Sequence, residues 1–379
     1  MSEINTQKFE PGTHPDMSPP VTSVGVLGWL HENLFSNVFN SILTFVGIYL
    51  VYTVFAPLIE WAFINADWVG ASENRDDWSR DDCTSGGACW VFVNVRFQQF
   101  MYGFYPTEEI WRVSLSGLVL ALTLAWLMLP KLPYKGYAAA FGLLIFPIIV
   151  FFLMGGGVFG LEPVETSIWG GLSLTLILAL VGMVAALPLG IILALGRRSD
   201  MPIVRALCTA FIELWRGVPL ITVLFMSSVM LPLFLPEGAN FDKLLRALIG
   251  ISLFQSAYMA EVVRSGLQAI PNGQYEAADA LGLSYWKKML FVILPQALKL
   301  VIPGIVNTFS ELFKDTTLVL IIGLFDLLAM VQAAFADPKW LGFAIEGYVF
   351  TAFVFWIFCF GMSRYSMSLE RKLHTGHKR

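Results

Sequence analysis

The stretch PNGQYEAADALGLSYWKKMLFVILP, residues 271–295, interrupts a sequence that is otherwise largely apolar. Its pattern is that of a short helix that starts at Asn272 and Gly273 and carries the small residues Ala277 and Ala278 on one face with Leu281. Gly282 follows, and glycine readily adopts the left-handed backbone that ends a helix sharply. The pattern therefore predicts a short polar helix that can approach another protein closely and on which a second, soluble protein acts.

The composition is that of a polytopic membrane protein. Of the 379 residues, 56% are hydrophobic and only 14% are charged, against ~25% charged in ordinary soluble domains. Several apolar runs exceed ~18 residues, which is long enough to cross a bilayer as a helix. The predicted fold class is an all-α membrane protein with eight transmembrane helices, at about 40–63, 112–130, 136–155, 168–196, 217–235, 244–263, 296–324 and 344–363.

The segments between the spans differ in character. Residues 1–35 are polar and rich in proline, and no signal peptide is expected because no basic stretch precedes a short apolar one. The loop 64–109 is acidic. Residues 201–216 have an amphipathic pattern, and the short apolar run 325–336 fits an interfacial or re-entrant piece better than a span. The chain ends in a basic tail at 366–379.

The distribution of lysine and arginine orients the chain. Threading eight spans with both termini inside collects most of the basic residues on one side, including Arg197–Arg198 and Lys287–Lys288, and cytoplasmic loops are the basic ones. The stretch 271–295 is therefore predicted to face the cytoplasm and the loop 64–109 to face outward. On that side Cys83 and Cys89, in the segment CTSGGAC, are candidates for a disulfide. The alternative is two free thiols.

Motifs of catalysis and nucleotide binding are missing from the sequence. It has no G-x-x-x-x-G-K-[ST] segment, no nucleophile elbow, no HExxH and no CxxC. One G-x-G-x-x-G occurs at Gly155, Gly157 and Gly160, but it follows a transmembrane run and not a strand, so it is interpreted as a flexible span end. No metal site is expected, and the chain is not expected to be an enzyme.

Charged residues in or beside membrane spans are costly and usually mark function. An acidic residue precedes a basic one by three positions on three successive core helices, which places both on one face where they can neutralise one another. For the first two pairs, which lie near the predicted inner boundary, an ion pair that steadies a helix end is the ordinary explanation. The pairs are Glu213 and Arg216, Glu261 and Arg264, and Glu311 and Lys314.

The third pair has a different setting. Glu311, Lys314 and Asp315 lie near the middle of the seventh apolar run, before Thr316, and after a Pro-Gly pair at 303–304 that loosens the helix. Loosened backbone at this depth is tolerated where it lines a cavity. A cluster of both signs suits a zwitterion, so these residues are predicted to line a substrate path.

The stretch 276–295 resembles the EAA motif of bacterial ABC-importer permeases, E-A-A-x3-G-x9-I-x-L-P. Here Val292 stands in the isoleucine place, which is a conservative departure. The flanks FIELWRGVPL (211–220), SAYMAEVVRSGLQAIPNGQ (256–274) and LFKDTTL (312–318) are similar to the polar-amino-acid branch of those permeases, in which Val218 and Thr317 replace the usual Thr and Ser. The resemblance covers about 168–365. The whole layout is similar to the larger permease subunit of the general L-amino-acid importers of Gram-negative bacteria.

The resemblance implies a five-helix type I permease core at 161–365, with a coupling helix at 271–286, and an N-terminal extension of three spans at 36–160. It implies a multi-pass protein of the bacterial inner membrane. The partners would be a second permease subunit in a heterodimer, two ATPase subunits, a periplasmic amino-acid-binding protein, L-amino acids and the lipid bilayer, with no nucleic acid. This chain would bind no cofactor, because ATP and Mg²⁺ would sit on the ATPase subunits.

Two sets of site residues follow from the resemblance and the charge pattern. The ATPase-coupling set is Glu276, Ala277, Ala278, Gly282, Leu294 and Pro295. The substrate-path set is Asn307, Glu311, Lys314, Asp315, Thr316, Glu261, Tyr258, Glu213 and Arg216.

Other functions remain as alternatives at this point. An ion-driven secondary amino-acid transporter would use Glu311, Glu261 and Asp315 as its ion relay and would need no ATPase. An intramembrane enzyme lacks a nucleophile–base or metal set. The acidic loop 64–109 can also act as a docking module alongside transport.

Overall fold

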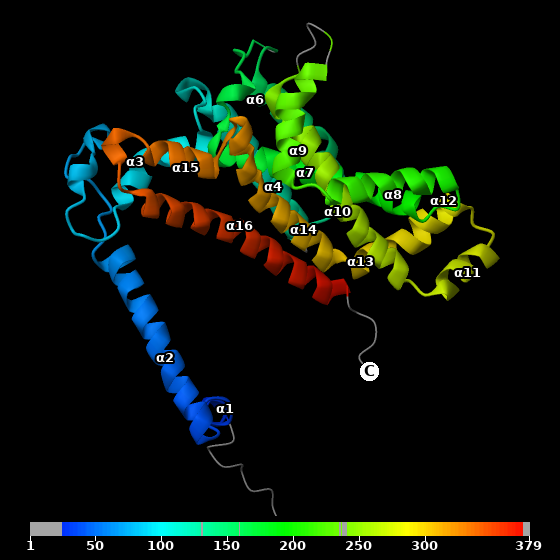
Figure 1. Cartoon of the computed structure of the whole chain (residues 1–379), viewed down its shortest axis with the longest axis horizontal. Coiled ribbons are helices and arrows are strands. Elements are labelled where there is room, and N and C mark those ends of the chain that lie inside the picture. The colour runs from blue at the N-terminus through cyan, green and yellow to red at the C-terminus, as the bar shows by residue number, and fades with distance from the viewer. Residues whose placement is uncertain (1–24, 130–131, 159, 235, 237–240, 374–379) are drawn as a thin grey trace, which may run out of the picture. The chain divides into compact units, whose positions relative to one another are not determined.

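A computed structural model describes residues 25–129, 132–158, 160–234, 236 and 241–373. Helices make up most of these residues, as the sequence predicts, and their order along the chain can be followed in Figure 1. Parts of the predicted tails, residues 1–24 and 374–379, lie outside the described residues.

The chain divides into two compact units. The smaller comprises Met1–Asp67 and Cys83–Ala88, and the larger comprises Trp68–Asp82 and Cys89–Arg379. In the smaller unit, the side chain of Asn37 caps α2 by accepting from the backbone N–H of Asn40 at 2.8 Å. None of the side chains of α2 is buried. The elements of this unit are α1 (Gly25–Asn33), α2 (Val38–Ile59) and the π-helical turn η2 (Glu60–Ile64).

The larger unit contains the remaining elements. Its long helices are joined by short 3₁₀ and π-helical segments and by one two-residue strand. They are η3 (Arg75–Asp77), η4 (Arg80–Asp82), α3 (Trp90–Tyr102), η5 (Thr107–Glu109), α4 (Ile110–Met128), α5 (Lys135–Ala140), η6 (Phe141–Ile145), α6 (Phe146–Gly155), η7 (Thr166–Ile168), α7 (Gly171–Arg197), α8 (Pro202–Arg216), α9 (Leu220–Phe225), η8 (Met226–Met230), η9 (Leu231–Phe234), α10 (Lys243–Ala269), α11 (Asn272–Ala280), α12 (Tyr285–Lys288), η10 (Met289–Ile293), α13 (Leu294–Leu300), α14 (Ile302–Asp315), η11 (Thr316–Ile322), β1 (Phe325–Asp326), α15 (Leu327–Phe335), η12 (Pro338–Trp340) and α16 (Ala344–Leu373).

Five helical segments of the described chain are long and apolar enough to cross a membrane, and there are up to seven spans if each of two bent pairs counts as one. Eight spans were expected, and that count is not confirmed, because α10 at the predicted sixth span does not meet the same test. The five are Val38–Ile64, Thr107–Met128, Lys135–Gly155, Gly171–Arg197 and Ala344–Arg371. The bent pairs are Pro202–Arg216 with Leu220–Phe234, at 101°, and Tyr285–Leu300 with Ile302–Ile322, at 65°.

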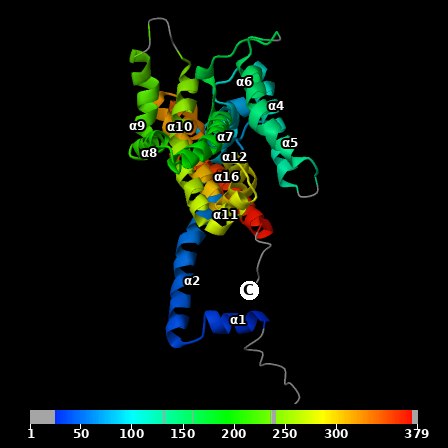
Figure 2. The same ribbon diagram turned by 90° about the vertical axis from the view of Figure 1, so that its right-hand side faces the viewer.

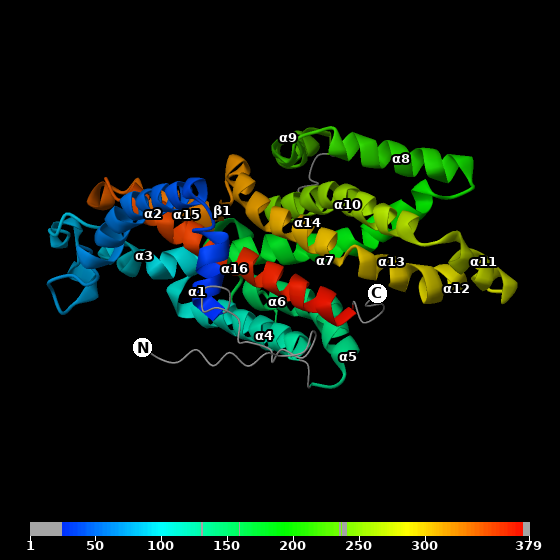
Figure 3. The ribbon, with the colours of Figure 1, turned by 90° about the horizontal axis from the view of Figure 1, so that it is seen from below.

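The centre of the larger unit is the pair α7 and α10, which pack along most of their length. Gly190 permits this approach, because a Cβ at that position would lie 2.7 Å from the Cβ of Met259. Figure 3 shows α8 and α9 on one side of this pair and α4 to α6 on the opposite side. The view in Figure 2, at right angles, shows the same separation, with α7 between the two groups.

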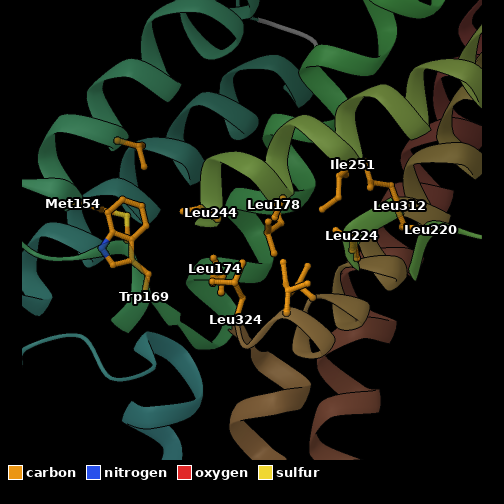
Figure 4. Packing of buried hydrophobic residues seen from close by; sticks show 14 of the residues in the cluster. Met154, Trp169, Leu174, Leu178, Leu220, Leu224, Leu244, Ile251, Leu312 and Leu324 are labelled. Atoms are coloured by element: carbon orange, nitrogen blue, oxygen red, sulfur yellow. The ribbon is translucent and has the colours of Figure 1, made fainter. Parts of the chain in front are cut away.

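One hydrophobic core joins α6 to the helices that follow it. Met154 of α6, Trp169 and the α7 residues Leu174 and Leu178 are buried in the same cluster as Leu312 of α14 (Figure 4). Burial of apolar side chains is the main stabilising term in such a cluster. The helices α4 and α6 therefore share a core with α7, although the sequence pattern assigns them to the N-terminal extension.

The helix α3 is anchored at one end of the larger unit. The buried carboxylate of Glu346, in the first turn of α16, accepts from the backbone N–H of Cys89, and this satisfies a donor at the start of α3. Phe92 packs against the buried Trp340, with ring centroids 5.5 Å apart.

Cys83 and Cys89 are both disulfide-bonded, whereas Cys208 and Cys359 are free thiols.

A second buried carboxylate lies in β1, outside the candidate spans. Asp326 is fully buried and caps α15 by accepting from the backbone N–H groups of Leu328 and Ala329. Burial raises the pKa of Asp326 to about 6, although these two hydrogen bonds act in the opposite direction. The short predicted piece 325–336 is thus β1 followed by α15, a nine-residue helix with mostly buried side chains.

Candidate functional site

The polar stretch that interrupts the apolar sequence forms α11. The helix begins at Asn272, and its last turn is closed by two backbone bonds, from the N–H of Gly282 to the oxygen of Asp279 at 2.9 Å and from the N–H of Leu283 to the oxygen of Ala278 at 3.2 Å. Gly282 has φ +70°, and together these features form a Schellman motif. The predicted helix stop at Gly282 is therefore confirmed.

Side-chain contacts tie α11 to the helices on either side of it. The hydroxyl of Tyr275 donates to the backbone oxygen of Leu267 in α10 at 3.1 Å. Arg198, just after α7, donates to the Tyr275 hydroxyl at 3.3 Å and places its guanidinium carbon 5.7 Å from the ring centroid. Lys288 in α12 forms an ion pair with Asp279 at 2.5 Å. A displacement of α11 would therefore act directly on α10, α12 and the end of α7.

The six predicted coupling residues divide into an exposed and a buried group. Glu276, Ala277, Gly282 and Pro295 are exposed, so they are available to a partner. Ala278 is only 2% exposed, because it packs inside its own chain. The predicted small-residue contact face therefore retains Ala277 and the 79% exposed Leu281 but loses Ala278. Leu294 is likewise buried, in the core beneath α11.

A cluster of ion pairs connects α7, α8 and α10 close to α11. Glu261 of α10 is its centre. It forms ion pairs with Arg197 at the end of α7 at 2.6 Å, with Arg264 on its own helix at 2.8 Å and with Arg216 of α8 at 3.6 Å. One half-buried carboxylate thus contacts three guanidinium groups from three helices, and Glu213 supplies a second negative charge to Arg197.

Of the two ion pairs predicted near the inner boundary, one is confirmed and one is wrong. Glu261 and Arg264 do pair, but Glu213 pairs with Arg197 at 2.8 Å and not with Arg216. Arg216 instead forms an ion pair with Glu261. It also lies over Tyr258, with its guanidinium carbon 5.8 Å from the ring centroid. The spacing on α8 is compatible with a local pair, but α10 presents a more buried carboxylate to Arg216.

The residues on α14 form a separate group. Glu311 and Lys314 are not paired in the part of the chain that the structure describes. Instead the side-chain amide of Asn307 donates to Glu311 at 2.9 Å. Asn307, Glu311 and Lys314 are exposed on this chain, while the hydroxyl of the buried Thr316 donates to the backbone oxygen of Phe313. The nine predicted path residues therefore fall into two groups, one around Glu261 and one formed by the α14 residues up to Asp315 together with Thr316 at the start of η11.

The sequence pattern did not single out Arg197 and Tyr275 as site residues. Arg197 belongs to the Arg-Arg pair that served only to orient the chain, and its partners are 64 and 16 residues away. Tyr275 lies in the middle of the polar stretch, but nothing in its spacing indicates a contact with Arg198. Within the described residues, no three His, Cys, Asp or Glu side chains are grouped in a way that could hold a metal ion.

Comparison with known protein families gives one match to a family model. Residues 186–375 match the family described as binding-protein-dependent transport system inner membrane component. The matched region runs from the middle of α7 through α11 to the end of the described chain, and it includes Glu261, Glu276 and Gly282.

Two similar proteins extend over nearly the whole chain. One is the inner membrane amino-acid ABC transporter permease protein YhdY of Escherichia coli, which is 58% identical over 364 residues, covering 96% of this chain and 97% of that protein. The other is the glutamate/glutamine/aspartate/asparagine transport system permease protein BztC of Rhodobacter capsulatus, which is 39% identical over 424 residues, covering 95% and 96%. Among solved structures, an amino acid ABC transporter crystallised with histidines is 28% identical, with a TM-score of 0.47, over 53% of this chain and 92% of that one.

Proposed function

This chain belongs to the family of inner membrane components of binding-protein-dependent transport systems, and we propose that it is a permease subunit of an ATP-driven importer of L-amino acids. The observation that carries the proposal is α11, an exposed helix with a Schellman end that is tied to α7 and α10 by Tyr275 and Arg198. The two long relatives, both named as amino-acid permease proteins, support the substrate class.

In this proposal α11 is the coupling helix. Its exposed residues Glu276, Ala277 and Leu281 would seat in a groove of an ATPase subunit, with the Glu276 carboxylate facing a basic group there. ATP and Mg²⁺ would be held by that partner, and this chain would bind no cofactor. Closure of two ATPase subunits would displace α11, and the contacts of Tyr275 and Lys288 would pass the displacement to α10 and α12.

The ion-pair cluster around Glu261 would make α7, α8 and α10 move as one body. Arg197 and Arg216 reach Glu261 from two other helices, so separating those helices would leave charges unpaired. The α14 residues Asn307, Glu311 and Asp315 would line the amino-acid path at the interface with a second permease subunit. A periplasmic binding protein would deliver the amino acid.

The proposed topology has eight spans with both termini in the cytoplasm of a bacterium, and α10 would be the sixth span, the one that the length and hydropathy test leaves out. The helix α10 has 27 residues, which is ample for a crossing, and apart from the exposed Lys243 at its start its charged residues Arg246, Glu261 and Arg264 are buried or paired. The same topology places α11 and the charge cluster at the cytoplasmic face.

The test is reconstitution of the chain with its second permease subunit, the ATPase and the binding protein in proteoliposomes. Uptake of a mixture of radiolabelled L-amino acids should require both ATP and the binding protein. It should persist when ionophores dissipate proton and sodium gradients. Uptake driven by an ion gradient without ATP would instead identify an ion-driven secondary transporter and overturn the proposal.

A further inference from the structure

Arg246 stands out among the arginines of the larger unit because it is buried and has no counter-charge among the residues that the structure describes. It lies in the first turn of α10 and is 9% exposed. No carboxylate of the described residues lies within ion-pair distance of it, whereas Arg96, Arg112, Arg197, Arg216 and Arg264 each have one. Arginine stays protonated in proteins, so it cannot escape this cost by losing its charge.

Arg246 also lacks hydrogen-bond acceptors among the described residues. Its Nη1 donates to the backbone oxygen of Ser228 at 2.5 Å, while Nε is buried with no acceptor in the part of the chain that the structure describes. A guanidinium has five N–H donors, and its side edge is shaped for the two oxygens of a carboxylate. The side chain is therefore held in place by one bond and still lacks the partners that a buried guanidinium needs.

The backbone opposite Arg246 is irregular. Ser228 belongs to the π-helical turn η8, which continues directly into the 3₁₀ turn η9. π-Helical turns are rare and are often found at functional sites. Irregular backbone in a membrane protein is tolerated where it lines a cavity or a path. One turn further along α10, Gly250 leaves room for the Ser227 side chain, whose Oγ would lie 3.0 Å from a Cβ at that position.

We propose that Arg246 binds the α-carboxylate of the transported amino acid at the outer end of the permease. The inference rests on the proposed function, which places the start of α10 on the periplasmic side. The α-carboxylate is common to all L-amino acids, so a fixed guanidinium recognises the class and leaves the side chain to other residues. Lys243, three positions earlier on α10, carries the same charge but is exposed to solvent and needs no partner.

The variants Arg246→Met and Arg246→Lys test this role, with Lys243→Met as the matched control. All are studied in the complete complex with the second permease subunit, the ATPase and the binding protein. Arg246→Met should lower uptake of a radiolabelled L-amino-acid mixture at least tenfold, and Arg246→Lys should lower it less. Lys243→Met should stay within twofold of the wild type.

Thermal stability separates a binding role from a structural one. Removing an uncompensated buried charge should leave the Tm of the Arg246→Met complex equal to or above that of the wild type, whereas loss of a structural arginine lowers it. Excess L-amino acids should raise the Tm of the wild type but not of Arg246→Met. The corresponding amino-acid α-amides, which lack the carboxylate, should raise neither.

Several results would overturn the assignment. These are wild-type uptake by Arg246→Met, a fall in Tm that accounts for the lost uptake, or equal stabilisation of the wild type by the α-amides. Loss of the second permease subunit during purification of Arg246→Met would assign the missing carboxylate to that subunit and would also overturn it. If the wild-type complex itself shows no ATP-dependent uptake, the proposed function fails independently of Arg246.

Discussion

The Nη1 atom of Arg197 lies 2.6 Å from the Oε1 atom of Glu261, and this contact joins the end of α7 to the last turns of α10. The two helices are already packed along most of their length. The ion pair adds a point of attachment at the end nearest α11, where Arg198, the next residue, contacts Tyr275. Glu261 is thus the residue on which the charge balance of this end of the molecule depends.

Replacing Glu261 by Gln should destabilise the protein, because three arginines lose their central carboxylate. We expect a loss of about 1–3 kcal/mol for removing a half-buried, hydrogen-bonded charge. Glu213→Gln is the matched control. Its carboxylate is 56% exposed, so its loss should cost less than about 1 kcal/mol. The Tm of the purified variants in detergent measures the difference, and equal effects of the two substitutions would contradict the central role of Glu261.

Within this chain, substitutions at Gly282 should act through backbone conformation. Its φ is +70°, and apart from its chain neighbours no atom of the described residues lies within 4 Å of the position that a Cβ would occupy. Asn tolerates this conformation, Ala costs about 1 kcal/mol and a β-branched residue costs more. Amino-acid uptake should therefore fall in the order Gly282→Asn, Gly282→Ala, Gly282→Val. Equal uptake by the Asn and Val variants would show that the helix stop is not needed for coupling.

The α14 residues should affect transport without affecting assembly. Glu311→Gln and Asp315→Asn each remove one negative charge from the predicted path, and we expect uptake to fall about tenfold, which corresponds to ~1.4 kcal/mol. Co-purification with the ATPase should remain at the wild-type level, in contrast to Glu276→Lys on α11, which should weaken it. Unchanged uptake kinetics in both α14 variants would remove these residues from the path.

The stability of the protein should depend on pH through Asp326. Its pKa is raised from 3.8 to about 6 on folding, so the folded chain holds this proton more tightly than the unfolded chain does. The stability that the protonated form contributes is fully present below about pH 4 and is lost as the pH rises through about 6, by about 3 kcal/mol in total. Asp326→Asn keeps an oxygen to cap α15 and should remove this dependence. If the Tm of the wild type and the Tm of Asp326→Asn changed in parallel between pH 5 and pH 7.5, Asp326 would not be the source of the pH dependence.

Much of the fold could be predicted because it depends on local properties. Apolar length identified the single-helix spans, and the breaks of 101° and 65° fall where the sequence places an amphipathic segment and a Pro-Gly pair. The stop of α11 at Gly282 follows from the backbone freedom of glycine. The span at α10 is harder to assign by composition, because Arg246, Glu261 and Arg264 lower its mean hydropathy and are tolerated only through burial or pairing.

The charged residues show where local rules stop. Spacing of three residues correctly paired Glu261 with Arg264, because both lie on one helix. The same rule failed for Glu213 and for Glu311, whose partners are Arg197 on another helix and Asn307 one turn earlier. A side chain pairs with the most favourable opposite group within reach, and for residues near helix ends that group often belongs to a neighbouring helix.

The sequence by itself determined the membrane class, the position of the polar stretch 271–295 and the residues that end its helix, because hydropathy and glycine conformation act within a few residues. The tertiary structure decided which side of α11 is free. It buried Ala278 and exposed Ala277 and Leu281, although the sequence pattern places all three on one face of the helix. It also buried Arg246 with no counter-charge among the described residues, because burial depends on helices brought together from distant parts of the chain.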